Sequence, residues 1–158
     1  MDTKPKYSLL EARQKLEAYC AYQERCAQEI RDKCKNWRMD YEHTDILIAD
    51  LISNNFLNEE RFAKAFVSGK FRIKKWGRNK IRLHLKQKNI SDYSIRSGME
   101  EIEEEEYLQT LSELVEKKVQ LSTEKDPWKL RVKLQRYLNS KGYEGDLIRN
   151  TLEDWFAK

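Results

Sequence analysis

Apolar residues recur at helical intervals along most of the chain, and polar or turn-forming residues separate the apolar runs. Ser8 and Glu11 have the spacing of a capping box, which predicts a helix beginning near residue 8. The same periodicity continues to Cys34, which is too far for an average helix, so we expect one long helix or two with a break within residues 22–25. Five Gly and two Pro in 158 residues are few for a strand-and-turn architecture, and the pattern therefore predicts an all-α fold.

Capping and stop signals place the next elements. Thr44 or Asp45 is the expected N-cap of a helix that stops at the left-handed pair Asn54-Asn55. Asn58 is the expected N-cap of the following helix, and Gly69 is expected to mark its frayed end. Further helices are predicted at residues 77–88, from 91–92 to a break near the Glu run at 100–106, at 107–121, at 127–141 with Pro127 as first helical residue, and over 147–155.

The apolar pattern contains an internal repeat. A spacing that begins at Ile81 recurs 53 residues later at Leu134, and a weaker copy lies about 51 residues earlier at Ile30. We therefore expect three tandem three-helix repeats in an elongated, curved arrangement, with boundaries at 1–57, 58–106 and 107–158. The overlaid positions are Ile30, Cys34, Met39 and Ile46; Ile81, Leu85, Ile90 and Ile95; and Leu134, Leu138, Tyr143 and Ile148.

The charge is distributed unevenly between the middle of the chain and the rest. Residues 61–91 hold eleven Lys or Arg and no Asp or Glu, although the whole chain carries a formal net charge of only +4. The remaining residues therefore sum to −7, and six Glu lie within residues 100–106. Such asymmetry predicts an anionic partner, and the Glu run is either a solvated acidic face or an internal neutraliser of the basic segment. The alternative is that the basic segment is only the solvated face of a helix and binds no partner.

Several features of the basic segment favour a contact surface. Arg78, Arg82 and Lys86 recur at i, i+4 and i+8, which forms one stripe on a helix whose N-terminus would add its own preference for anions. Trp76 is either a stacking platform for a base or an Arg, or a lid on its own repeat, and we favour the lid. DNA phosphates and protein carboxylates both remain open as the target. The candidate partner- or DNA-binding residues are Arg72, Lys74, Lys75, Trp76, Arg78, Lys80, Arg82 and Lys86.

The residues give little support for catalysis, metal binding or membrane insertion. Cys20, Cys26 and Cys34 lack the spacing of a zinc site and are expected to be reduced, partly buried thiols. No nucleotide-binding loop or nucleophile elbow is present, and the two His have no metalloprotease spacing. No signal peptide or apolar span is apparent. We therefore expect a cytoplasmic protein that is not an enzyme and needs no cofactor.

Residues 56–91, FLNEERFAKAFVSGKFRIKKWGRNKIRLHLKQKNIS, resemble the signature region of the bacterial RecX family. The segment YLNSKGY, Tyr137–Tyr143, is similar to that family's Arg-Phe-Leu-x-x-Arg-Gly-Phe segment. Asn89 stands where the family has Gly, and in the first repeat Trp37-Arg38-Met39 replaces the corresponding turn. The matching positions are Glu60, Arg61, Phe62, Ala63, Gly77, Ile81, Leu85, Lys88 and Ile90.

The resemblance implies a regulator that acts by binding. A family member would lie along the groove of the RecA–DNA filament and lower its ATPase, recombinase and coprotease activities, in DNA repair, homologous recombination and the SOS response. The implied partners are the RecA filament and single- and double-stranded DNA, and we expect a monomer. Arg61 would be the residue whose ion pair ties its helix to a neighbouring repeat. The alternative is a helix-turn-helix DNA-binding module in which the helix after Gly77 enters a groove.

Overall fold

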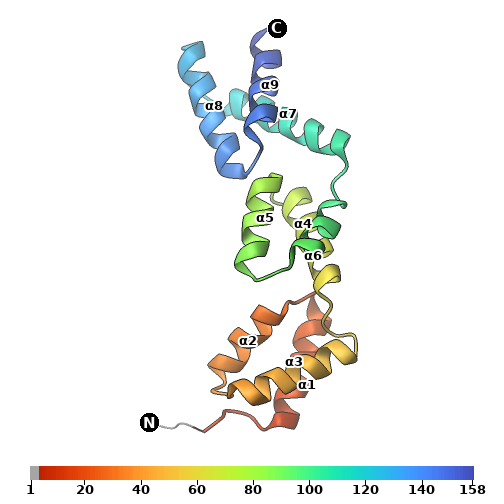
Figure 1. Cartoon of the computed structure of the whole chain (residues 1–158). Coiled ribbons are helices and arrows are strands. Elements are labelled where there is room, and N and C mark those ends of the chain that lie inside the picture. Colours follow the sequence, from red (N-terminus) through yellow and green to blue (C-terminus); the bar gives the residue numbers. More distant parts are fainter. Residues whose placement is uncertain (1–3) are drawn as a thin grey trace. The chain divides into compact units, whose positions relative to one another are not determined.

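The computed structural model describes residues 4–158, and within this range the chain forms helices and no strand (Figure 1). This confirms the expected all-α fold. Of the two alternatives for the first apolar run, one long helix or two, the structure has two: α1 ends at Tyr22 and α2 begins at Ala27. The helices are α1 (Leu9–Tyr22), α2 (Ala27–Asn36), α3 (Tyr41–Ser53), α4 (Glu59–Arg72), α5 (Arg78–Gln87), α6 (Asp92–Met99), α7 (Glu104–Leu121), α8 (Pro127–Lys141) and α9 (Gly145–Phe156).

The chain divides into two compact units. The first unit comprises the described residues up to Ala65 together with Leu85–Gly98, and the second comprises Phe66–His84 together with Met99–Lys158. Helices α4 and α5 are each shared between the two units. The repeat boundaries expected at residues 57 and 106 stay a prediction.

Local capping explains where most helices begin. The capping box of Ser8 and Glu11 is formed, and the Asn58 side chain accepts from the amide of Arg61 at 2.9 Å. The cap predicted at Thr44 or Asp45 is wrong, because Asp40 accepts from the amide of His43 at 2.8 Å and starts α3 earlier. Thr44 instead lies buried inside the helix.

Helix α4 is longer than predicted. It continues through Gly69 to Arg72, and the chain reverses only at Lys75, which has φ +60°. Gly69 therefore does not mark a frayed end. The backbone amide of Trp76 donates to the carbonyl of Lys70 at 3.0 Å, which satisfies one of the carbonyls left open at the end of the helix.

One turn recurs at the ends of α2, α5 and α8. Arg38, Asn89 and Gly142 have φ of 59°, 62° and 99°, and each lies in the left-handed region. After each of them the next amide donates back to a carbonyl five residues earlier, as Met39 does to Cys34 at 2.9 Å. Trp37-Arg38-Met39 therefore forms the same turn as the other two segments, although its residues differ from the pattern.

The core of the first unit is built from the inner faces of α1, α2 and α3. Of the overlaid repeat positions, Ile30 and Cys34 are buried, but Ile46 is 43% exposed, and Leu47 takes the buried place on α3. The alignment of the first repeat at Ile46 is therefore off by one residue. The buried cluster comprises Ala12, Leu16, Cys20, Ile30, Cys34, Leu47, Ile48, Leu51 and Leu57.

Arg61 links α4 to the loop between α1 and α2 inside the first unit. Its Nε donates to Glu24 at 2.6 Å, and its terminal nitrogens donate to the side chain and carbonyl of Asn55 at 3.1 and 3.0 Å. The expected structural ion pair is confirmed. Because one guanidinium joins the Glu24 carboxylate to the backbone at Asn55, its hydrogen bonds restrain both loops.

The core of the second unit contains an aromatic series. The rings of Phe71 and Tyr107 are 5.7 Å apart, and those of Tyr107 and Tyr143 are 5.1 Å apart, in tilted arrangements that aromatic pairs favour. All three residues are almost fully buried. Ile81, Leu134 and Leu138 are also buried, as the repeat predicted.

Cys20, Cys26 and Cys34 are free and buried, and burial raises the pKa of Cys20 and of Cys26 to about 11. These thiols are therefore protonated at neutral pH and are poor nucleophiles. Across residues 4–158, no helix has the length and apolar character that crossing a membrane requires.

Candidate functional site

The connector between α4 and α5, residues 73–77, carries two exposed lysines of the basic segment. Its backbone is held by the turn after α8. The Lys141 ammonium donates to the carbonyl of Lys74 at 2.8 Å, and the Tyr143 hydroxyl donates to the carbonyl of Lys75 at 2.9 Å. The side chains of Lys74 and Lys75 are themselves exposed. The fold thus fixes this connector while it leaves two ammonium groups in solvent.

Trp76 lies at the centre of a group of cations. The Lys70 ammonium lies 5.0 Å from the centre of the indole ring and that of Lys80 lies 4.5 Å away, both within cation–π range. The His84 ring is 4.6 Å from the indole, centre to centre. The half-buried indole thus packs on residues of its own unit, as a lid would.

Lys141 joins this group from the other end of the second unit. Burial lowers the pKa of its ammonium, and the neighbouring charges of Lys80 and Lys74 lower it further. Lys70 and Lys141 were not among the predicted site residues. Lys70 was predictable as a site residue because it lies in the acid-free segment 61–91. Lys141 was not, because only the fold brings it next to Lys74. We call Lys70, Lys74, Lys75, Lys80 and Lys141 the lysine cluster.

The N-terminus of α5 is not available to an anion. The amides of Gly77 and Asn79 donate to the carbonyls of Lys141 and Gly142 at 2.7 and 2.9 Å, and the amide of Arg78 donates to the Tyr107 hydroxyl at 2.9 Å. The expectation that this helix end would attract an anionic partner is therefore wrong. Three of its amide groups already have partners within the second unit.

Arg78 is committed to an internal network. Its guanidinium forms ion pairs with Glu144 at 2.9 Å and with Glu104, and its central carbon lies 3.9 Å from the centre of the Tyr107 ring. Only 20% of the side chain is exposed. Burial acts to lower the pKa of the guanidinium, but the hydrogen bonds to Glu144 and Glu104 outweigh it and raise the pKa.

Tyr107 completes this network. Its hydroxyl donates to Glu144 and accepts from the Arg78 amide. Burial, together with the hydrogen bond to the Glu144 carboxylate, raises the pKa of the Tyr107 hydroxyl well above its ordinary value. The phenol therefore stays protonated and serves as both donor and acceptor at the centre of the second unit.

The Glu run neutralises part of the basic segment. Arg72 pairs with Glu106 at 3.5 Å, donates to the carbonyl of Glu101 at 3.2 Å and also bonds to Ser68, while Glu104 pairs with Arg78. This agrees with the internal-neutraliser alternative. Arg72 remains exposed, so its ion pair is open to solvent and weak.

The predicted stripe on α5 is not a uniform row of available cations. Arg78 faces the internal network, whereas Arg82 is half-buried and Lys86 is exposed. Lys86 also belongs to the first unit, while Arg78 and Arg82 belong to the second. The residues that the structure brings together are thus Lys74, Lys75, Trp76 and Lys80, with Lys70 and Lys141 added.

Residues 4–158 contain no group of three or more His, Cys, Asp or Glu side chains that could hold a metal ion. The chemistry of the site is that of exposed ammonium groups beside an aromatic ring. Such a surface binds phosphate or carboxylate groups through charge.

Comparison with known families gives two matches along the chain. Residues 58–99 match the description "RecX, second three-helix domain", and residues 104–152 match "RecX, third three-helix domain". The first matched segment contains Trp76 and Arg78, and the second contains Tyr107, Lys141 and Glu144. The lysine cluster and the internal network of Arg78 therefore both fall within matched regions.

Two named relatives share about a third of their residues with this chain. A Clostridium botulinum (strain Alaska E43 / Type E3) protein, "Regulatory protein RecX", is 34% identical over 128 residues, which are 80% of this chain and 59% of that protein. A protein of the same name from Clostridium perfringens (strain 13 / Type A) is 34% identical over 120 residues, 75% of this chain and 56% of that protein. The chain spans less than two thirds of either relative.

Solved structures share the fold. The crystal structure of RecX from Lactobacillus salivarius aligns with a TM-score of 0.81 at 19% identity and covers 95% of this chain and 97% of that one. A crystal structure of regulatory protein RecX aligns with a TM-score of 0.83 at 20% identity and covers 92% and 73%. These similarities confirm the helical repeat fold.

Proposed function

This chain belongs to the RecX family, and we propose that it binds the RecA–DNA filament and mainly inhibits the ATPase, recombinase and coprotease activities of that filament. The relatives that it matches are named regulatory proteins. We propose that it acts as a cytoplasmic monomer in DNA repair, homologous recombination and the SOS response, through binding and without catalysis. The chain matches 59% of the length of the Clostridium botulinum relative. The activity and partners of a whole RecX protein are therefore part of what we propose for this chain.

The observation that carries this proposal is the lysine cluster around Trp76. Lys74 and Lys75 extend into solvent from a connector whose backbone is held by Lys141 and Tyr143. A rigid support lowers the entropy cost of ordering these side chains against a partner. Single- and double-stranded DNA within the filament and acidic side chains of RecA both offer the required negative charge.

The geometry argues against the helix-turn-helix alternative. In that mode the N-terminal residues of the recognition helix contact base edges in the major groove. Here the N-terminus of α5 is covered, because the backbones at Gly77 and Gly142 are in direct contact. The expected DNA binding in the absence of RecA is therefore weak and indifferent to sequence.

The decisive measurement is RecA ATPase on single-stranded DNA while this protein is titrated in. The rate should fall with the wild-type chain and fall much less with the double variant Lys74→Glu/Lys75→Glu. The double variant Lys35→Glu/Lys117→Glu makes the same change in net charge at exposed residues that do not belong to the lysine cluster, and it should inhibit like the wild type. An unchanged ATPase rate at saturating wild-type protein would overturn the proposal. Equal inhibition by both double variants would show that the lysine cluster does not contact the filament.

A further inference from the structure

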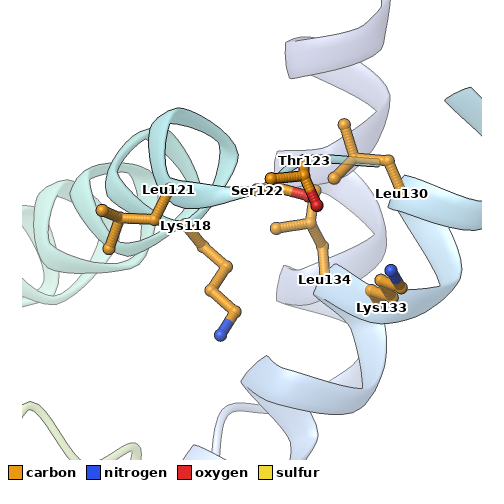
Figure 2. A pocket seen from close by; sticks show the side chains of 7 residues that line it. All are labelled: Lys118, Leu121, Ser122, Thr123, Leu130, Lys133 and Leu134. Atoms are coloured by element: carbon orange, nitrogen blue, oxygen red, sulfur yellow. The ribbon is translucent and has the colours of Figure 1, made fainter. Parts of the chain in front are cut away.

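A shallow hollow lies in the second unit between the end of α7 and the first half of α8 (Figure 2). Its volume is about 250 Å³, and its lining includes the apolar residues Leu121, Leu130 and Leu134 and the hydroxyl residues Ser122 and Thr123. Lys118 of α7 and Lys133 of α8 also line it, so that cationic side chains from two helices border one hollow (Figure 2). Leu121 is 73% exposed, which is unusual for a large apolar side chain beside a hollow.

Helix α8 makes this region strongly cationic. Between Pro127 and Lys141 the helix has five Lys or Arg and no Asp or Glu, a second acid-free stretch outside residues 61–91. Only Leu134 and Leu138 of this helix are buried. Most of its surface therefore faces solvent. Lys129 and Arg136 are exposed on it, whereas Lys133 pairs with Glu124 and Lys141 donates to the carbonyl of Lys74.

Lys133 already pairs with a carboxylate of the same chain. In the linker after α7, the Glu124 carboxylate lies 3.2 Å from the Lys133 ammonium. The same carboxylate also accepts from the Asp126 amide at 3.2 Å. A carboxylate carried on an extended segment thus already sits at the border of the hollow.

A second hollow adjoins the first through Lys133, which lines both. Its volume is about 260 Å³, and it lies beside Trp128, which is 72% exposed. Lys129 and Arg136 border it, and Val132 contributes apolar surface. The two hollows form one surface in which apolar side chains alternate with cations.

We propose that this surface of α7 and α8 is a docking site for an acidic peptide segment that carries a large apolar side chain. The apolar side chain would occupy the hollow beside Leu121, Leu130 and Leu134. One flanking carboxylate would pair with Lys118, whose ammonium lies 4.6 Å from the centre of the Tyr137 ring, and another would replace Glu124 at Lys133. A single-stranded nucleic acid fits the first hollow less well, because its apolar lining is aliphatic and offers no ring for base stacking; the exposed ring of Trp128 lines the second hollow. The site is separate from the lysine cluster, and the proposal does not depend on the proposed function.

Fluorescence anisotropy tests the proposal with the full chain and a labelled peptide of sequence DDELFDD. The peptide should bind saturably, and the variant Lys118→Glu/Lys133→Glu should weaken binding about tenfold or more, because both charge pairs become repulsive. Leu121→Ser should also weaken binding, since it removes exposed apolar surface without touching the core. The matched control Lys117→Glu/Lys125→Glu changes the net charge equally at exposed residues that line neither hollow.

Four outcomes would overturn the proposal. The first is absence of saturable binding by the wild type. The second is equal weakening by the control, which would show attraction by net charge alone. The third is that a peptide with Leu and Phe replaced by Ser binds as tightly, which would show that no apolar side chain is recognised. The fourth is that a thymidine oligonucleotide displaces the peptide while Leu121→Ser has no effect, which would assign the surface to nucleic acid. Circular dichroism of each variant separates loss of binding from loss of fold.

Discussion

Gly77 and Gly142, which are 65 residues apart in the sequence, lie in direct backbone contact. A β-carbon on Gly77 would come within 2.4 Å of the Gly142 carbonyl carbon, and one on Gly142 would come within 2.3 Å of the Lys80 β-carbon. The same contact lets the carbonyls at the end of α8 accept from the first amides of α5. The positive φ of Gly142 adds a second reason for glycine there.

Replacement of Gly77 by Ala should destabilise the chain by about 2 kcal/mol, because the added methyl group meets backbone atoms that cannot move aside cheaply. Urea unfolding followed by circular dichroism measures the change. Gly69→Ala is the matched control. Gly69 lies inside α4 with open space around it, so that substitution should stabilise by about 0.5–1 kcal/mol. Equal effects of the two changes would contradict the close contact.

Replacement of Arg78 by Met should cost about 2 kcal/mol, because it leaves Glu144 without its cation inside the second unit. The midpoint of urea unfolding gives the value. Arg82→Met, on the same helix, removes a half-exposed cation for which no ion pair is seen in the described structure, and it should change stability by less than about 0.5 kcal/mol. If Arg78→Met were as mild as Arg82→Met, Arg78 would be a surface cation and not a structural one.

Glu59 should make stability depend on pH in the acid range. Burial acts to raise the pKa of its carboxyl, but hydrogen bonds from the hydroxyl and amide of Ser91 outweigh this and lower it. Since the folded pKa lies below the unfolded one, the stabilisation is present above the unfolded value of about 4.3 and is lost as pH falls through the folded pKa.

The check is the difference in unfolding free energy between the wild type and Glu59→Gln. It should be largest near neutral pH and should shrink steadily as pH falls from about 5 to 3. The exposed Glu105→Gln serves as the control for loss of a carboxylate outside this contact. A difference that stays constant over this range would mean that Ser91 does not stabilise the ionised carboxylate.

Salt dependence should reveal which anion meets the lysine cluster. If Lys74 and Lys75 contact DNA phosphates, the log–log slope of filament binding against salt should become shallower by about 0.7–0.9 per cation removed in Lys74→Glu/Lys75→Glu. If Lys74 and Lys75 contact RecA carboxylates instead, the variant should bind the filament more weakly, but the slope should not change by that amount for each cation removed. Filament binding that is insensitive to salt for the wild type would exclude both kinds of contact.

The sequence by itself determined the elements and the repeat. The capping box at Ser8, the N-cap at Asn58, the left-handed stop at Asn55 and the helix start at Pro127 were all predictable, because each depends on residues within one or two helical turns. The basic segment and the regulatory family were also accessible, since composition and motif spacing are properties of the chain.

Only the tertiary structure decided what the charged residues do. The stripe Arg78, Arg82 and Lys86 is correct in helical spacing, yet Arg78 turns inward because Glu144, 66 residues away, lies beside it. Lys141 reaches the carbonyl of Lys74 across 67 residues of sequence and so joins a cluster that no local pattern marks. Helical periodicity indicates which side of a helix faces inward, but the partner that it meets there depends on how distant segments pack.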